Sequence, residues 1–424
     1  MRKTNPFLKR PGSFWKSLGP GLITGASDDD PSAITTFSQA GAKYGLLTLW
    51  TAIFAFPVLA VLQEICARIG IVTGKGLPGV LRSHYPRWLL YSLILLSCPA
   101  FLLNIGADIA VMGEAGNLLF PRIPAFYWSL AFTLLLFTAM LTLPYKKLAG
   151  IMKFFCLVLF VYMIVPFLSS QNPHLILKRS FIPSFRFDRN FFILLTGITG
   201  AIISPYLFFW QTSSAVEHMA ITDPERKKSK KKIFISMRLD ILTGAFFAVL
   251  IMYFIILTTG AILYDHGIKN IETLKDAALA LRPLAGNLSY TLFAAGIIGT
   301  GFLIIPVLSS SVSYIISEAF NQKSGLSLLP EEAKLFYLVI AMAMGFGISM
   351  TAIGISSVKA LFFTTVIYGI TTPFLIGMIL HISNNKKVLG LYCNKRLSNL
   401  VGGFALALMM ATLFFLVYFL ATGQ

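Results

Sequence analysis

Charged residues are scarce in this sequence. Asp, Glu, Lys and Arg make up only 12% of its 424 residues, about half the share that a soluble domain carries. Hydrophobic residues supply 56%, and apolar runs long enough to cross a bilayer recur along the whole length. The composition excludes an ordinary soluble protein and predicts an all-α polytopic membrane protein.

Cysteine and histidine are also few. The four cysteines, Cys66, Cys98, Cys156 and Cys393, form no CxxC pair and no metal-ligand spacing. None of the five histidines lies deep in an apolar run, so a histidine proton relay has no support. We therefore expect no bound cofactor and no enzymatic chemistry.

The net charge of +18 comes from basic residues at the ends of apolar runs, with the run "RKKSKKK" (226–232) in one loop. This pattern favours a topology signal, with a lipid-headgroup contact as the alternative, and it does not indicate a nucleic-acid partner. It predicts a plasma (inner) membrane protein with a cytoplasmic N-terminus. The sequence does not define an oligomeric state.

We expect a single transmembrane domain over 1–424 with eleven spans, which would leave the C-terminus outside. The predicted spans are 15–41, 45–70, 88–113, 124–144, 147–169, 190–216, 237–264, 285–318, 333–352, 355–382 and 398–421.

Two of these spans are interrupted at their middle. The first contains "SDDDP" (27–31) and the sixth contains "TGITGAIISPYLFFWQ" (196–211). Proline removes a helical hydrogen bond, and the freed backbone groups must line protein or a water-filled cavity rather than lipid. Because the two spans are five apart, we predict two inverted five-helix repeats, 1–169 and 190–382, followed by an additional helix at 398–421.

Asp28, Asp29 and Asp30 lie at the first break. Three carboxylates at membrane depth repel one another, and they cannot all stay charged without a cation or protons. The alternative is that Asp30, directly before Pro31, caps a helix. With the hydroxyl of Ser204 at the second break, the donors are all oxygen, which favours Mg²⁺, Ca²⁺ or Mn²⁺ over Zn²⁺, Cu⁺ or Fe²⁺.

Other polar residues are embedded in the spans. Asp108 in span 3 either relays ions or protons or bonds a neighbouring helix, and Thr365 belongs to a polar stripe in span 10 that either joins helices or lines the path. Glu64 and Arg68 are four apart and predict a local ion pair.

The stretch "GPGLITGASDDDPSA" (19–33) resembles the first-helix pattern of the Nramp family of divalent-metal transporters, whose ligand Asp falls on Asp30. "LQEICARIGIVTGKGL" (62–77) is similar to the second helix of that family. "GAIISPYLFF" (200–209) occupies the place of its sixth-helix Met-Pro-His pattern. The resemblance implies a LeuT-type fold and metal contacts from the carbonyls of Ser27 and Ala201.

The departures from the family pattern are informative. Its Asn ligand becomes Ala33, its Met ligand becomes Ser204, and two of its histidines become Tyr206 and Gln211. The acidic partner of the third-helix Asp becomes Val111. The loss of soft and proton-handling groups resembles the Nramp-related magnesium transporter branch.

We therefore expect uptake of Mg²⁺, and also of Mn²⁺, by alternating access without proton coupling. Asp30 would be the central ligand, Asp29 and Asp28 would attract the ion or hold its water shell, and Ser204 would complete the site. Ala33, Tyr206, Asp108 and Thr365 would border the path. The alternatives are a proton-coupled Mn²⁺ or Fe²⁺ transporter, a LeuT-type carrier of amino acids or other organic solutes, and a metal sensor that does not transport.

Overall fold

The computed structural model describes residues 25, 27–143, 147, 150, 161–164, 172–222, 230–282, 286–352 and 356–422. Within these residues every regular element is a helix. The long ones are α3 (Pro31–Tyr44), α4 (Trp50–Thr73), α6 (Arg87–Leu119), α7 (Ala125–Thr142), α11 (Arg189–Ile202), α12 (Pro205–Thr222), α13 (Lys230–Thr259), α16 (Ser289–Ala319), α17 (Lys334–Ala352), α18 (Ser357–Asn384) and α20 (Arg396–Thr422). Short helices lie between them: α5 (Leu77–His84), α9 (Val161–Ile164), α10 (Pro173–Phe181), η4 (Gly260–Tyr264), α14 (Leu274–Ala278), η5 (Leu279–Leu281), η6 (Gly286–Leu288), α19 (Lys386–Leu389) and η7 (Gly390–Tyr392).

Nine helical segments of the described chain are long and apolar enough to cross a membrane. They confirm predicted spans 2–4 and 6–11, with α11 and α12 together forming the sixth. Only the C-terminal half of span 1 is described, as α3, and most of span 5, Cys156 and residues 226–229 of the basic run lie outside the described residues. The division into two repeats stays a prediction.

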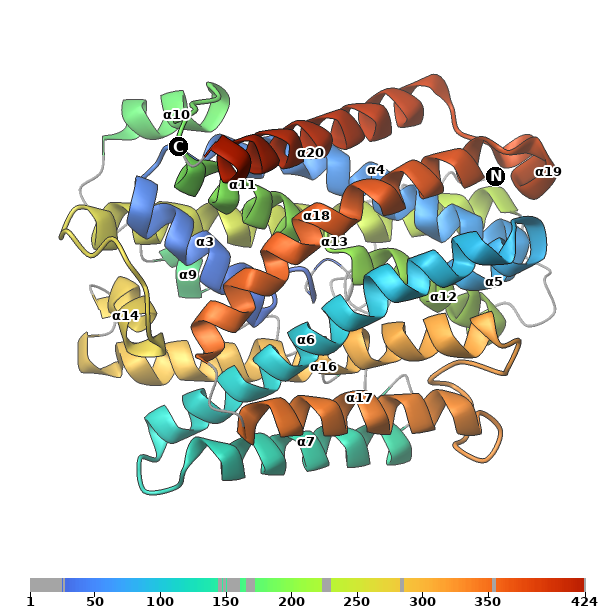
Figure 1. Cartoon of the computed structure of the whole chain (residues 1–424), viewed down its shortest axis with the longest axis horizontal. Helices are drawn as coiled ribbons and strands as arrows, with labels where there is room; N and C mark the ends of the chain where they lie inside the picture. The colour runs from blue at the N-terminus through green and yellow to red at the C-terminus, as the bar shows by residue number, and fades with distance from the viewer. Residues whose placement is uncertain are drawn as a thin grey trace, which may run out of the picture.

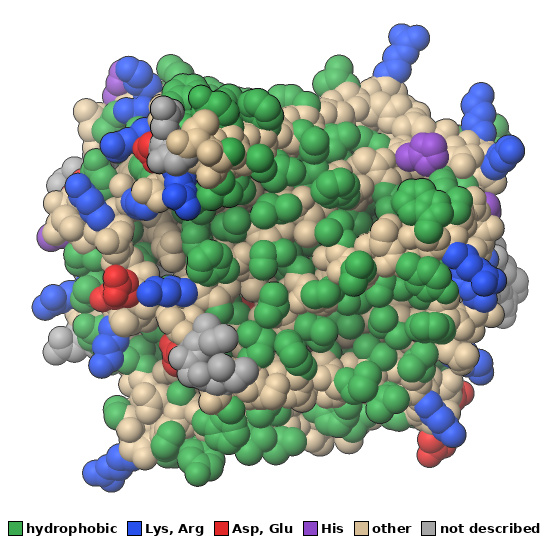
Figure 2. Space-filling model, in the orientation of Figure 1, with side chains coloured by type: hydrophobic (Ala, Val, Ile, Leu, Met, Phe, Trp, Pro, Cys, Tyr) green, Lys and Arg blue, Asp and Glu red, His purple; other side chains and the backbone are tan. Residues whose placement is uncertain are grey.

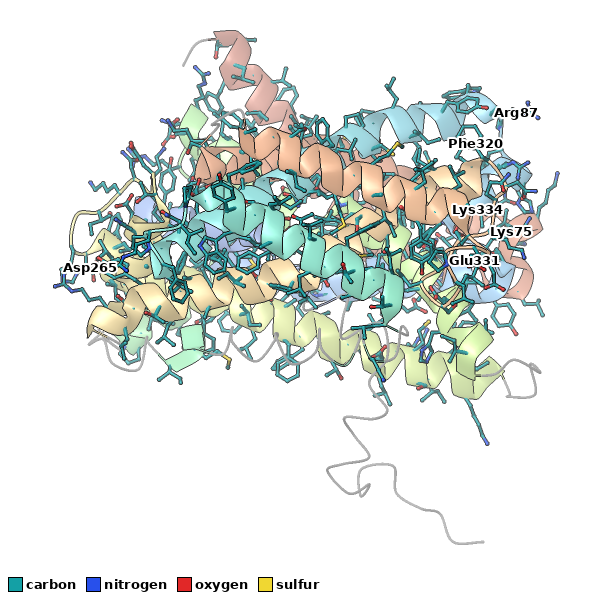
Figure 3. The ribbon with its side chains drawn as sticks, turned by 90° about the horizontal axis from the view of Figure 1, so that it is seen from below. Lys75, Arg87, Asp265, Phe320, Glu331 and Lys334 are labelled. Carbon is teal, nitrogen blue, oxygen red and sulfur yellow. The ribbon has the colours of Figure 1, made fainter. Side chains whose placement is uncertain are left out.

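Helices α7, α16, α17 and α20 run roughly along the long axis of the molecule, and α6 and α18 cross it obliquely (Figure 1). Hydrophobic side chains cover the middle of the visible face, whereas Lys, Arg, Asp and Glu gather toward its two ends (Figure 2). Lys75, Arg87 and Lys334 lie at one end and Asp265 at the other (Figure 3). An apolar band between two charged ends is the pattern of a protein that spans a bilayer along that axis.

Helices α3, α11 and α18 pack against one another. Gly200 of α11 lies against the carbonyl of Thr365 and the backbone nitrogen of Gly369, both in α18, so closely that a Cβ would overlap them. Close approach over small residues is how helices associate when lipid supplies no hydrophobic force between them. This packing positions the second break beside the first.

The predicted local ion pair is confirmed. Arg68 Nη2 lies 3.7 Å from Glu64 Oε2, and Arg238 of α13 lies 3.4 Å from the other oxygen of the same carboxylate. Arg68 also donates a hydrogen bond to Asn394. The pair therefore joins α4 to two other parts of the chain, which the sequence spacing does not reveal.

Candidate ion site

The first break is a short unwound segment directly before α3. Gly25 and Ser27 are helical, the N–H of Asp28 donates to the carbonyl of Gly25 over 3.2 Å, and Asp30 is extended, with φ −71° and ψ 170°. Asp30 caps α3, because its Oδ1 accepts the N–H of Ala33 over 2.6 Å, and Pro31 is the first helical residue. The helix-capping alternative is therefore confirmed, and it does not occupy the whole carboxylate.

The second break separates α11 from α12. Helix α11 ends at Ile202, and Pro205 begins α12. Between them, the hydroxyl of Ser204 donates to the carbonyls of Ala201 over 2.8 Å and Gly200 over 3.3 Å. The two predicted ligands at this break are thus bonded to each other.

The two breaks meet in space although they lie more than 170 residues apart. The hydroxyl of Tyr206, in the first turn of α12, donates to the carbonyl of Ser27 over 2.9 Å. The carboxylate of Asp28 also reaches the hydroxyl of Ser204. The structure therefore brings Ser27, Asp28 and Ser204 together, as the sequence predicted.

The three aspartates are almost completely buried, with 4%, 2% and 2% of Asp28, Asp29 and Asp30 exposed. Asp28 Oδ1 and Asp29 Oδ2 have no hydrogen-bond partner among the described residues. A buried carboxylate oxygen without a donor is strongly destabilising unless it binds a cation or a proton. The buried carboxylates at the first break therefore favour the binding of a cation or a proton.

Helix α6 supplies a polar residue that the sequence reasoning did not assign to the site. Asn104 is fully buried, its Nδ2 donates to Asp30 Oδ2 over 3.2 Å, and its Oδ1 accepts the hydroxyl of Thr364 over 2.8 Å. In the sequence, the one indication of this role is that Asn104 lies one helical turn before Asp108 in an apolar span. Only the crossing of α6 and α3 reveals what it contacts.

Thr365 and Asp108 lie beside these residues. The hydroxyls of Thr365 and Thr36 are 2.9 Å apart and join α18 to α3. Asp108 is fully buried, is close enough to Asp30 for their charges to interact, and has no hydrogen-bond partner for either carboxylate oxygen within the described chain. A helix contact therefore explains Thr365, whereas no described contact explains Asp108.

The atoms at the two breaks that could bind a metal ion are oxygens. No group of three or more His, Cys, Asp or Glu side chains in the described part of the chain has a metal-holding arrangement. Ala33 contributes only a methyl group. An ion here would be held by one or two carboxylates together with hydroxyls, carbonyls and water, which is how proteins commonly hold Mg²⁺.

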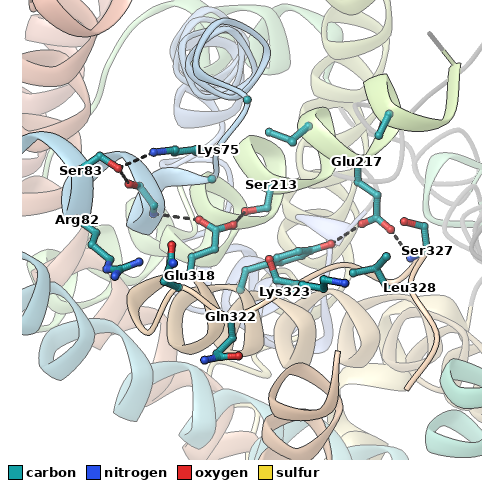
Figure 4. Close-up of a pocket in the computed structure, with 18 residues that line it drawn as sticks. Lys75, Arg82, Ser83, Ser213, Glu217, Glu318, Gln322, Lys323, Ser327 and Leu328 are labelled. Atoms are coloured by element: carbon teal, nitrogen blue, oxygen red, sulfur yellow. Dashed lines mark hydrogen bonds between the residues drawn. The ribbon is translucent and has the colours of Figure 1, made fainter. Parts of the chain in front are cut away.

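A separate cavity of about 440 Å³ lies at the end of the molecule that carries Lys75 and Arg82 (Figure 4). Two carboxylates in its wall are hydrogen-bonded. Glu318 accepts from Ser213 over 2.9 Å and from the N–H of Gly79 over 3.0 Å, while Glu217 accepts from Tyr314 over 2.6 Å and from the N–H of Ser327. Helices α5, α12 and α16 are held together at this end by side-chain acceptors.

The long apolar helices and the two facing breaks define the LeuT-type fold of membrane transporters. A crystal structure of the Eremococcus coleocola manganese transporter, in complex with an aromatic bis-isothiourea substituted compound, matches 96% of this chain and 87% of its own with a TM-score of 0.75 at 19% identity. Mhp1, a nucleobase-cation-symport-1 family transporter in a closed conformation, matches 95% of this chain and 92% of its own with a TM-score of 0.61 at 12% identity. These similarities confirm the predicted fold.

The family model described as Natural resistance-associated macrophage protein-like, Nramp, matches residues 21–419, and the chain belongs to this family. The divalent metal cation transporter MntH of Bacillus subtilis is 27% identical over 413 residues, covering 94% of this chain and 91% of its own. MntH of Chromohalobacter salexigens is 25% identical over 420 residues, covering 97% and 93%. The resemblance predicted from "GPGLITGASDDDPSA" is confirmed at the level of the family.

Proposed function

We propose that this chain is a transporter, not an enzyme, and that it carries divalent metal cations across the membrane by alternating access with Asp30 as the central ligand. The observation that carries the proposal is the burial of Asp28, Asp29 and Asp30 where two helix breaks meet, with carboxylate oxygens that lack donors. The names of the MntH relatives, divalent metal cation transporters, support the same class of cargo.

Manganese is the cargo that the relatives favour. The structural neighbour from Eremococcus coleocola is a manganese transporter, and its similarity covers nearly the whole chain. This supports the Mn²⁺ alternative better than the Mg²⁺ uptake predicted from the sequence. Mn²⁺ accepts the same octahedral arrangement of oxygen ligands as Mg²⁺.

Magnesium is the second candidate, and the side chains at the breaks favour it. Ser204 and Ala33 stand where the family pattern places a Met and an Asn, so no soft ligand contributes from either position. Mg²⁺ gives up its water shell reluctantly and needs only one or two carboxylates. A site with few protein ligands allows that shell to remain.

Proton coupling is part of the proposal for the manganese alternative. Asp108 is fully buried close to Asp30, and both of its carboxylate oxygens lack partners within the described chain. A buried carboxyl that can gain and lose a proton near the ion site is suited to couple proton movement to metal movement.

An inside-negative potential of 100 mV adds about 4.6 kcal/mol to the entry of a divalent cation.

Uptake into proteoliposomes tests these proposals. We expect Mn²⁺ uptake, with Mg²⁺ as the competing cargo, and loss of both with Asp30→Ala. Glu331→Gln, in the exposed connection between α16 and α17, is the matched carboxylate control and should transport normally. A luminal pH dye separates the alternatives: acidification that follows Mn²⁺ entry supports proton coupling, and metal entry without it supports uncoupled uptake.

The proposal is wrong if Asp30→Ala transports either ion at the wild-type rate. Uptake of amino acids in the absence of metal would support the organic-solute alternative instead. The three aspartates oppose that outcome, because they would repel a substrate carboxylate.

A further inference from the structure

Residues 172–189, which we call the α10 loop, form an exposed surface that the proposed transport does not use. The loop contains α10 and the chain that leads from it into α11. Six of its large hydrophobic side chains are between 41% and 71% exposed: Leu175, Leu177, Phe181, Ile182, Phe185 and Phe187. A group of exposed apolar side chains marks a surface that meets a partner or a membrane.

The α10 loop is held against the helix bundle by hydrogen bonds. The hydroxyls of Ser180 in α10 and Tyr253 in α13 are 2.9 Å apart, and the indole N–H of Trp50 in α4 donates to the carbonyl of Ser184 over 3.3 Å. At the end of the loop, Asp188 caps α11. The exposed side chains of the loop are therefore held in place by the chain that carries them.

Aromatic contacts connect the α10 loop to the outer faces of the spanning helices. The ring of Trp50 lies 5.3 Å from that of Phe185 and 5.8 Å from that of Phe54, an exposed residue of α4. The ring of Phe187 lies 6.2 Å from that of Phe415 in α20. Helix α10 lies at the end of the bundle where α20 finishes (Figure 1). The loop therefore continues the apolar surface of the bundle to the level of the lipid headgroups.

Basic side chains accompany the apolar ones. The α10 loop contains four Lys or Arg residues and a single acid, Asp188. Arg186 already pairs with this acid, because its Nε lies 2.9 Å from Asp188 Oδ2. Lys178, Arg179 and Arg189 form no ion pair with a carboxylate of the described chain. Three positive charges of the loop therefore lack a counter-charge among the described residues.

A topology signal does not account for this charge. The span Arg189–Ile221 separates the α10 loop from the basic run 226–232, so the two lie on opposite sides of the membrane. The bias of Lys and Arg marks only the cytoplasmic side. If the run 226–232 is the topology signal, the basic residues of the α10 loop have a different role.

The residue pattern of α10 is that of a helix at a membrane surface. Ile176 and Ser180, four residues apart, face the bundle, where Ile176 is partly buried and Ser180 is buried. Leu177 and Phe181 form an exposed apolar strip, and Lys178 is exposed beside it. A helix with an apolar strip and a basic side lies in the interface, with its apolar residues below the headgroups and its charges at the phosphates.

We propose that the α10 loop is a binding surface for anionic phospholipid, with Leu177 and Phe181 among the acyl chains and Lys178 and Arg189 at the lipid phosphates. This partner is apolar on one side and negatively charged on the other, which complements both parts of the loop. A Lys or Arg near an anionic lipid surface strengthens binding about fivefold. The surface is independent of the proposed transport of divalent cations.

Native mass spectrometry of the purified full chain in detergent, titrated with phosphatidylglycerol or phosphatidylcholine, tests the proposal. We expect the wild type to bind phosphatidylglycerol more tightly than phosphatidylcholine. The double variant Lys178→Gln with Arg189→Gln should raise the apparent dissociation constant for phosphatidylglycerol at least about tenfold and leave that for phosphatidylcholine unchanged.

Lys269→Gln with Lys275→Gln is the matched control. It removes the same charge from two exposed positions at the same end of the molecule, in and before α14, and it should bind both lipids like the wild type (Figure 1). Leu177→Ser with Phe181→Ser should weaken the binding of both lipids, because acyl chains are common to them. An excess of glycerol 3-phosphate should not displace phosphatidylglycerol, because it lacks the acyl chains.

The proposal is overturned if the Lys178 and Arg189 variant binds phosphatidylglycerol as tightly as the control, or if the wild type binds both lipids equally. Complete displacement by glycerol 3-phosphate would show a site for free phosphate instead. If the double variant does not fold, Lys178→Gln alone decides, with an expected change of about fivefold. None of these measurements needs a metal ion, so their failure leaves the proposed transport standing, and a protein without transport leaves the lipid surface standing.

Discussion

Glu318 and Gly79 are joined by a hydrogen bond of 3.0 Å, in which the backbone N–H in the first turn of α5 donates to the carboxylate at the end of α16. The same carboxylate accepts the hydroxyl of Ser213 in α12 over 2.9 Å. A negative charge at a helix N-terminus also interacts favourably with the helix dipole. Glu318 therefore connects three helices at the end of the molecule that carries Lys75 and Arg82.

Glu318→Gln should loosen this end of the molecule. The amide keeps only one acceptor oxygen, so one of the two donors loses its partner, at a cost of about 1–3 kcal/mol. We expect a cysteine placed at Ala220, in the wall of the cavity, to react faster with a maleimide in this variant. Glu331→Gln is the control. Equal labelling rates in all three proteins would mean that the Glu318 contacts do not hold this end closed.

Two substitutions at Asp30 separate helix capping from ion binding. Asn can still accept the N–H of Ala33 but carries no charge, whereas Ala removes both functions. We expect both variants to lose metal uptake, and only Asp30→Ala to lose about 1 kcal/mol of stability from the missing cap. Thermal unfolding in detergent measures the second effect. Normal uptake by Asp30→Asn would show that the charge is not needed.

Ser204→Met should change the preference among ions. A thioether is a soft ligand that favours softer metals over Mg²⁺. We expect the ratio of Cd²⁺ or Mn²⁺ uptake to Mg²⁺ uptake to rise, measured by competition in proteoliposomes. Ser204→Ala is the control, because it removes the hydroxyl bonds to Ala201 and Gly200 without adding sulfur. An unchanged ratio in the Met variant would remove Ser204 from the site.

Gly200→Ala should push α11 and α18 apart. Its Cβ would overlap the carbonyl of Thr365 and the backbone nitrogen of Gly369, and overpacking of this kind costs about 1–3 kcal/mol. We expect a lower thermal unfolding midpoint. Gly377→Ala, in the partner helix α18, is the control, because nothing lies within 4 Å of its added methyl group. A Gly200 variant as stable as the control would contradict this account of the packing.

The sequence predicts features that depend on local chemistry. Pro31 and Pro205 locate both breaks, because a proline at the first helical position marks where a helix begins. The apolar runs predict the spans within several residues, although α6 extends to Leu119, beyond the predicted end at 113. Helix α5 is missed because its "LPGV" start has the composition of a turn.

The contacts between distant residues could not be predicted in the same way. Asn104 and Asp30 are 74 positions apart, and their hydrogen bond depends on how α6 crosses α3. The bond between Ser204 and the Ala201 carbonyl is local, but whether the hydroxyl turns back to its own helix or outward depends on the unwound geometry. The spacing of residues in the sequence predicts neither of these hydrogen bonds.

The hydrogen bond from Tyr206 to the carbonyl of Ser27 also ties the two breaks together. A break in a buried helix frees backbone groups from their helical partners, and these groups need other partners. Here the partner comes from the first turn of α12, which begins at the other break. Any movement of α12 relative to the first break therefore has to replace this donor.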